Sequence, residues 1–157
     1  MTHKEIKKNT TSASDNISSE EVGLIQIAIR NIHQMSPIEK MEMVRFGVSK
    51  QFLEKFKITA SLDYDVLAKA LSVTRATLIN KQGVEKFNAQ ISAAIIALAD
   101  IYSYGYEVFK DEDRFNKWMS KPNQALDGQA PYDFLDNQYG RDEVKNIIGR
   151  IDYGVYS

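Results

Sequence analysis

The stretch from Asn88 to Phe109 constrains the fold of this chain more than any other part of the sequence. Most of it reads ISAAIIALADIYSYGYEVF, which is rich in alanine and apolar on nearly every side of a helix. A helix of that kind has no polar face to turn toward water, so neighbouring elements must cover it. The stretch therefore predicts a buried central helix with shorter segments packed around it.

The sequence before this stretch contains the signals of several shorter helices. Ser36-Pro37 combines a capping hydroxyl with proline at the first helical position, which predicts a helix that ends near Phe46-Gly47. Further helices are expected to start near Ser49, at Ser61 or Asp63, and at Thr74.

The segment from 21 to 35 fits two structures. Its apolar residues lie near helical spacing, but Ile25, Ile27 and Ile29 also alternate as they would in a strand. The first 20 residues are too polar to fold by themselves, and we expect them to form a disordered arm.

The sequence after the central stretch predicts two more helices separated by a loop. One starts near Asp111, and the segment SKPNQALDGQAP that follows is full of residues that break helices. Gly128 and Gly140 are expected to adopt positive φ. The last helix would turn four apolar residues to one face, namely Val144, Ile147, Ile148 and Ile151. Together these elements predict an all-α fold.

Composition narrows the class of protein. The 157 residues are 43% hydrophobic and 26% charged, and no apolar run approaches the roughly 18 residues of a membrane span. The chain has no cysteine and no secretory signal at its start, which favours the cytoplasm. His33 stands alone in an apolar stretch, where a structural histidine is the favoured interpretation, so we expect neither a metal nor a cofactor.

The charges are unevenly distributed along the chain. Residues 38–90 hold nine Lys and Arg against six Asp and Glu, whereas residues 91–157 hold seven against eleven. A basic middle followed by an acidic end suggests two binding surfaces with different partners, because only the first favours phosphate. Ordinary scatter of surface charge would produce the same numbers.

Residues 63–82, DYDVLAKALSVTRATLINKQ, match the spacing of a DNA-binding helix-turn-helix. In this interpretation Ala68 lies where the two helices approach, Val73 fills the turn, and Ser72 occupies the left-handed position at which glycine is preferred. The expected DNA-binding residues are Thr74, Arg75, Thr77, Asn80 and Lys81. An ordinary pair of antiparallel helices with solvated residues fits the pattern about as well.

The carboxy-terminal residues carry a more specific signal. From Phe115 onward the sequence closely resembles the toxin-binding domain of the Xre/MbcA/ParS antitoxins, the partners of RES-domain toxins. The residues that carry the resemblance are Phe115, Trp118, Pro122, Asn123, Leu126, Gly128, Pro131, Leu135, Gly140, Val144, Ile147, Ile151, Tyr153, Gly154 and Ser157. It extends upstream with lower specificity to about Ser36, where LAKALSVTRATL resembles the helix-turn-helix of the family.

The resemblance implies a function for the end of the chain. The apolar and aromatic run IDYGVYS either docks on its own domain or inserts into another protein. As the family implies, a RES toxin consumes NAD, and the carboxy-terminal region of the antitoxin blocks its pocket. The toxin-binding residues would then be Arg150, Tyr153, Gly154, Val155, Tyr156 and Ser157.

These expectations give a domain plan and a set of partners. A disordered arm (1–20) precedes a helix-turn-helix domain (21–90) and a toxin-binding domain (91–157), which share the long helix. The partners are a RES-domain toxin, operator DNA, and a second copy of the chain, because the run from Ile91 to Ile101 has more apolar surface than a few helices easily cover. The alternatives are a transcriptional regulator without a toxin and, with little support, an enzyme.

Overall fold

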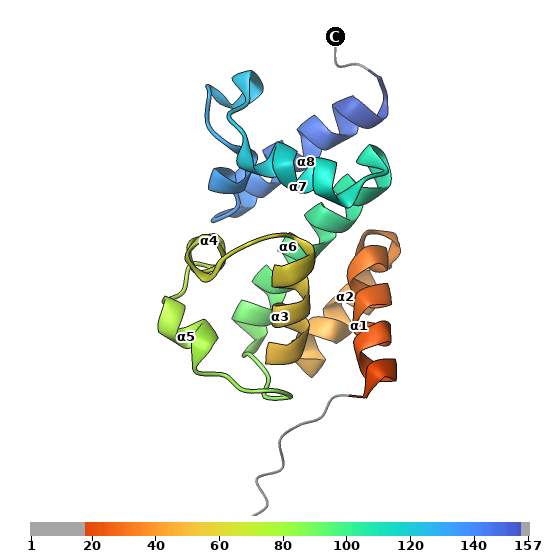
Figure 1. The fold of residues 1–157 in the computed structure, drawn as a ribbon, viewed down its shortest axis with the longest axis vertical. Helices are drawn as coiled ribbons and strands as arrows, with labels where there is room; N and C mark the ends of the chain where they lie inside the picture. Colours follow the sequence, from red (N-terminus) through yellow and green to blue (C-terminus); the bar gives the residue numbers. More distant parts are fainter. Residues whose placement is uncertain (1–17, 155–157) are drawn as a thin grey trace, which may run out of the picture.

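The central helix lies where the sequence predicts it, and the other helices surround it. The computed structural model describes residues 18–154, which form helices, turns and two isolated β-bridges (Figure 1). Helix α6 (Ala89–Phe109) crosses the middle of the molecule, and it contacts α1, α2, α4, α7 and α8. The all-α prediction is therefore confirmed for the described residues.

The first helices pack against α6 and against one another. They are α1 (Ser19–Asn31), the short 3₁₀ helix η1 (Ile32–Gln34), α2 (Pro37–Phe46) and α3 (Lys50–Thr59). The segment that could have been a strand is thus helical. Its helix starts at Ser19, within the expected arm, because Ser18 and Glu21 form a capping box; residues 1–17 lie outside the described part.

Side-chain caps explain where the helices begin. At the start of each α-helix in residues 18–154, one side-chain oxygen accepts a hydrogen bond from a backbone N–H of the first turn, which stabilises the helix end by about 1 kcal/mol. The capping residues are Ser18, Ser36, Ser49, Asp63, Thr74, Asn88, Asp111 and Asn137. Asp63, and not Ser61, starts α4 (Tyr64–Leu71).

The helices after α6 lie in the upper part of the molecule in Figure 1, above α4 and α5 (Arg75–Ile79). They are α7 (Glu112–Ser120), the 3₁₀ helices η2 (Gln124–Leu126) and η3 (Pro131–Phe134), and α8 (Gln138–Asp152). The expected loop is therefore a series of turns with two single helical turns inside it.

One prediction for this region is wrong. Gly128 has φ +79°, as expected, but Gly140 lies inside α8 with no positive φ. Gly140 is required for a different reason: a Cβ there would lie 1.9 Å from the carbonyl oxygen of Phe134. The absence of a side chain lets the first turn of α8 lie against the end of η3.

One continuous hydrophobic core joins the two halves of the molecule. It extends from Ile29 in α1 through α6 to Ile148 in α8. Within the run from Ile91 to Ile101 that suggested a dimer, Ile95, Ile96, Leu98 and Ile101 are buried in this core by the chain's own helices, whereas Ile91 is half-buried and Ala93 is exposed. None of the helices in residues 18–154 is long and apolar enough to span a membrane.

Candidate functional site

The end of α8 brings three of the expected toxin-binding residues together in solvent. Tyr153 closes the helix through its backbone N–H, which donates to the carbonyl of Gly149 at 3.0 Å, while its side chain is 82% exposed. Gly154 follows with φ +66°. Arg150 is exposed and its guanidinium lies 3.3 Å from Glu143. The other three expected residues, Val155, Tyr156 and Ser157, lie outside the described residues.

The inner face of α8 fixes the position of this end. Val144, Ile147 and Ile148 are buried, and Ile151 is half-buried, so the predicted apolar face is confirmed. Lys145 adds an ion pair, with its Nζ 2.8 Å from Oδ2 of Asp100 in α6. Tyr153 makes no comparable contribution to the core, so packing within the chain does not explain an aromatic residue there.

A buried carboxylate connects four elements near the middle of α6. Asp100 is 7% exposed, and its Oδ1 lies 3.1 Å from Nζ of Lys40 and 3.0 Å from Nδ1 of His33. Burial alone would raise the pKa of Asp100, but the hydrogen bonds from Lys145, His33 and Lys40 outweigh it and hold the pKa below its usual value. Asp100 therefore joins η1, α2 and α8 to α6 as a carboxylate.

The interpretation of His33 as a structural histidine is confirmed. Besides its contact with Asp100, the imidazole stacks on Tyr104 with the ring centres 4.2 Å apart. Its backbone N–H donates to Oγ of Ser103 at 3.1 Å, and that hydroxyl donates to the carbonyl of Arg30 at 2.7 Å. The histidine thus anchors η1 on the central helix.

The five expected DNA-binding residues lie on α5 and its two ends. Thr74 caps the helix, and its Oγ1 accepts from the backbone N–H of Thr77 at 3.2 Å. Arg75 is exposed, with its guanidinium 3.3 Å from Asp65. The helix is shorter than expected, because it ends at Ile79; Asn80 is its cap and Lys81 follows outside it.

The turn before α5 has the geometry that the sequence suggested. Ser72 adopts the left-handed conformation with φ 54° and ψ 43°, at the position where glycine is more usual. Its Oγ donates to the carbonyl of Asp136 at 3.2 Å, a contact between α4 and the segment that precedes α8. This contact gives a serine a role at that position which glycine would not have.

A buried lysine holds α5 in place. Lys50, at the start of α3, is 7% exposed, and its Nζ donates to the carbonyl of Leu78 at 2.5 Å and to the hydroxyl of Tyr64 at 2.7 Å. Glu54 balances its charge at 3.0 Å. Because Leu78 lies near the end of α5, this lysine joins three helices. Nothing in the local sequence around Lys50 indicated that it would be buried.

The comparison with protein families identifies the carboxy-terminal third of the chain. Residues 105–154 match the family model described as "Antitoxin Xre/MbcA/ParS C-terminal toxin-binding domain". "Prs ADP-ribosylating antitoxin" of a Sphingobium species is 23% identical over 146 residues, which cover 86% of this chain and 91% of that protein. Residues 105–154 therefore belong to the toxin-binding domain of the Xre-type antitoxins.

Two further antitoxins support the assignment. "Antitoxin Xre" of Photorhabdus laumondii is 33% identical over 76 residues, 48% of this chain and 51% of that protein. "Antitoxin Xre" of Yersinia enterocolitica is 23% identical over 119 residues, 74% of this chain and 80% of that protein. The matched toxin-binding domain includes the end of α6, all of α7 and α8, and both Arg150 and Tyr153.

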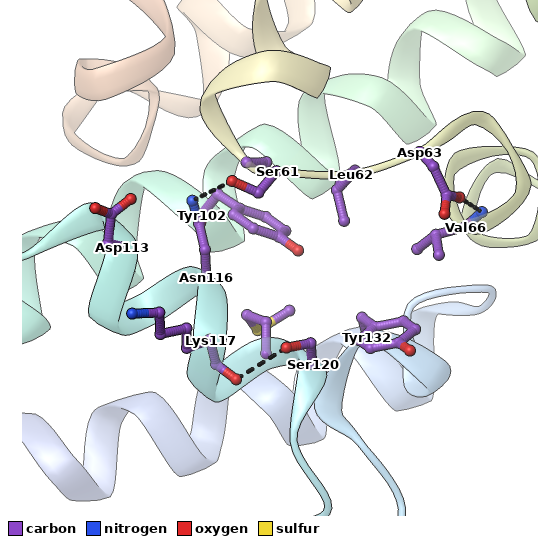
Figure 2. Close-up of a pocket in the computed structure, with 12 residues that line it drawn as sticks. Ser61, Leu62, Asp63, Val66, Tyr102, Asp113, Asn116, Lys117, Ser120 and Tyr132 are labelled. Carbon is purple, nitrogen blue, oxygen red and sulfur yellow. Dashed lines mark hydrogen bonds between the residues drawn. The ribbon is translucent and has the colours of Figure 1, made fainter.

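A cleft separates the matched toxin-binding domain from the connection between α3 and α4. Its volume is about 360 Å³, and its lining includes Leu62, Asp63, Asn116, Lys117 and Tyr132 (Figure 2). Asn116 closes one end, where its Nδ2 donates to the carbonyl of Thr59 at 2.8 Å.

Tyr102 forms part of the inner wall of this cleft. Its ring projects toward the cleft beside Leu62, and its buried hydroxyl makes no hydrogen bond to any of the described residues (Figure 2). Burial raises the pKa of Tyr102, which keeps the phenol neutral. The cleft therefore has a neutral aromatic wall with charged side chains at its margin.

Proposed function

We propose that this antitoxin neutralises a RES-domain toxin by inserting the segment from Tyr153 to Ser157 into the active site of the toxin. One observation carries the proposal: the matched toxin-binding domain ends at Gly154, and the aromatic side chain beside it is 82% exposed. A large exposed aromatic residue on a rigid helix end is the kind of anchor that dominates protein interfaces. The antitoxin itself has a binding role and not an enzymatic one.

The proposed target is a pocket for NAD. The resemblance to the family implies that RES toxins consume NAD, and the name of the Sphingobium relative refers to ADP-ribosylation, a reaction for which NAD is the donor. A NAD pocket must accept flat aromatic rings. The two tyrosines of the terminal segment, Tyr153 and Tyr156, provide such rings.

A variant that stops after Asp152 tests this proposal. Its fold and its DNA binding should be unchanged, because Val144, Ile147 and Ile148 stay in place on the inner face of α8. It should bind the product of the adjacent toxin gene at least about a hundredfold more weakly, since buried anchors each contribute 2 kcal/mol or more. It should also fail to rescue cells that express the toxin.

Two outcomes of that experiment would contradict the proposal. Full rescue by the truncated antitoxin would mean that the body of the domain blocks the toxin without the terminal segment. Loss of the circular dichroism signal on truncation would mean that the segment packs on its own domain. Incubation of the antitoxin alone with NAD should show no turnover.

We also propose that the antitoxin binds operator DNA through α5 and represses its own operon. The left-handed turn at Ser72, the cap at Thr74 and the exposed Arg75 support this function. A regulator without a toxin partner is the second candidate, and it predicts no co-purification with the neighbouring gene product.

Two substitutions separate the roles of the charged residues at α5. Lys81→Ala should weaken binding to all DNA sequences. It should also reduce the steepness with which the logarithm of the affinity falls with the logarithm of the salt concentration by about one, as for a single phosphate contact. Arg75→Ala should instead reduce the free energy of binding by roughly 1–3 kcal/mol and relax the sequence preference at one base position. Gel-shift titrations at several salt concentrations measure both, and unchanged affinity in both variants would mean that α5 does not enter the groove.

We propose that the antitoxin acts in the cytoplasm as a dimer, in which residues 21–90 bind DNA and residues 91–157 bind the toxin. A dimer matches the symmetry of two operator half-sites, and it strengthens the weak binding of a monomer in which only residues 38–90 carry a modest basic excess. Light scattering should give twice the 17.9 kDa mass of one chain. A strict monomer at micromolar concentration would contradict the dimer.

A further inference from the structure

The outer face of α8 carries a second exposed tyrosine. Tyr139, in the first turn, is 88% exposed, and Tyr153 at the other end is nearly as exposed. Their positions differ by fourteen residues, which places them about 40° apart around the helix axis and about 21 Å apart along it. The two rings therefore lie on one face, at its two ends.

The residues between the two tyrosines complete this outer face. Asp142, Asn146 and Arg150 follow at spacings of three and four, and all three are exposed. The opposite side of the helix holds the buried apolar residues that pack on α6 and η3. Tyr139 is thus not a residue of the core, and its ring gains almost nothing from burial within the chain.

We infer that the toxin lies along this outer face of α8, with Tyr139 as a second anchor in addition to the terminal segment. The inference rests on the proposed function, and it extends the contact from the end of the helix to its beginning. Both tyrosines lie inside the matched toxin-binding domain, residues 105–154. The face is also continuous with the segment proposed to enter the toxin.

The size of protein interfaces supports this extension. A stable complex usually buries about 20–30 residues on each partner, far more than the five residues from Tyr153 to Ser157. The additional contact area must adjoin that segment, and the outer face of α8 leads directly into it. Tyrosine is enriched at the centres of such interfaces because it buries a large ring with little loss of side-chain entropy.

Three variants of the full-length antitoxin test the inference by titration with the product of the adjacent toxin gene. Tyr139→Ala should lower the affinity at least about tenfold, as for an interface anchor. Asn146→Arg, which places a long charged side chain at the middle of the face, should lower it similarly. Phe46→Ala is the matched control, since Phe46 is 76% exposed on α2 in the other half, and it should change the affinity less than twofold.

The outcomes distinguish this inference from the proposed function. If truncation after Asp152 abolishes binding while Tyr139→Ala and Asn146→Arg bind normally, the inference is wrong and the terminal segment acts alone. If Tyr139→Ala weakens binding while the truncated antitoxin binds and neutralises normally, the outer face is the interface and the proposed insertion is wrong. The melting temperatures of Tyr139→Ala and Asn146→Arg should match that of the wild type, because both substituted residues are exposed.

Discussion

At the scale of single residues, buried polar groups show how strongly this small fold depends on a few contacts. Asp100 joins four elements through Lys40, His33 and Lys145, and its lowered pKa measures how well these partners stabilise the carboxylate. Tyr102 is the opposite case, because its buried hydroxyl has no hydrogen-bond partner within residues 18–154. The two residues lie two positions apart on α6 and predict opposite responses to mutation.

Asp100→Asn should lower the free energy of unfolding by about 3 kcal/mol, because it leaves two lysines near a neutral amide. A carboxylate whose pKa is lowered in the folded state contributes stability above the unfolded pKa of about 3.9, and this contribution is lost as pH falls through the folded pKa. Acidification should therefore destabilise the wild type more than the variant. Urea titrations between pH 7 and pH 3 measure this, with the exposed Asp127→Asn as control.

Tyr102→Phe should leave the free energy of unfolding unchanged or raise it by up to about 1 kcal/mol, since the removed hydroxyl has no partner. Tyr106→Phe is the matched comparison. The hydroxyl of Tyr106 lies 3.0 Å from Oδ1 of Asn116 and 3.2 Å from the carbonyl of Thr59, so its loss should cost about 1 kcal/mol. A large loss of stability in Tyr102→Phe would show that the hydroxyl is satisfied in solution.

At the scale of elements, close approach and capping decide how the helices meet. Gly105 gives room to the ring of Phe115, to which a Cβ would come within 2.1 Å. Gly140 likewise leaves room for the backbone carbonyl of Phe134. Side chains can move aside more easily than backbone, so the contact at Gly140 tolerates less change.

Gly140→Ala should lower the free energy of unfolding by about 2–3 kcal/mol, because the added methyl group clashes with a carbonyl and forces α8 away from η3. Gly149→Ala, in the same helix, is the matched control. Its Cβ would lie at an ordinary 3.4 Å from the hydroxyl of Tyr104, and alanine favours the helix by about 1 kcal/mol. Denaturant melts of both variants should therefore shift in opposite directions, and equal shifts would contradict the close approach at Gly140.

At the scale of the whole molecule, the single core couples the half proposed to bind DNA to the toxin-binding half. Lys69 pairs with Asp133 at 3.0 Å, and Asn116 reaches Thr59, so polar contacts also cross between the halves. Helices of both halves also pack on α6. A change in the packing of one half is therefore expected to alter the packing of the other.

Thermal unfolding should be a single cooperative transition, because neither half keeps its core without α6. Fluorescence of Trp118 reports on the toxin-binding half, whereas far-ultraviolet circular dichroism reports on all helices. The two signals should give the same midpoint within error. Two separated midpoints would show that the halves fold independently.

The sequence by itself determined most of the helices, because their signals are local, although it left residues 21–35 open between a helix and a strand. Caps such as Ser36 and Asn88, the proline at position 37 and the apolar face of α8 act within a few residues of their own position. The residues at the end of α8 were found through resemblance, and the motif that carries it is also contiguous. Even the left-handed turn at Ser72 could be expected from the spacing of its neighbours.

Only the tertiary structure decided which polar residues are buried and which aromatic residues are left in solvent. Asp100 meets Lys40 and Lys145 across 60 and 45 residues of chain, and no local pattern encodes such a meeting. The same holds for Lys50, whose burial depends on where Leu78 comes to lie, and for Tyr139, whose exposure depends on which face of α8 packs on α6. A helix signal is a property of neighbouring residues, whereas burial is a property of the assembled chain.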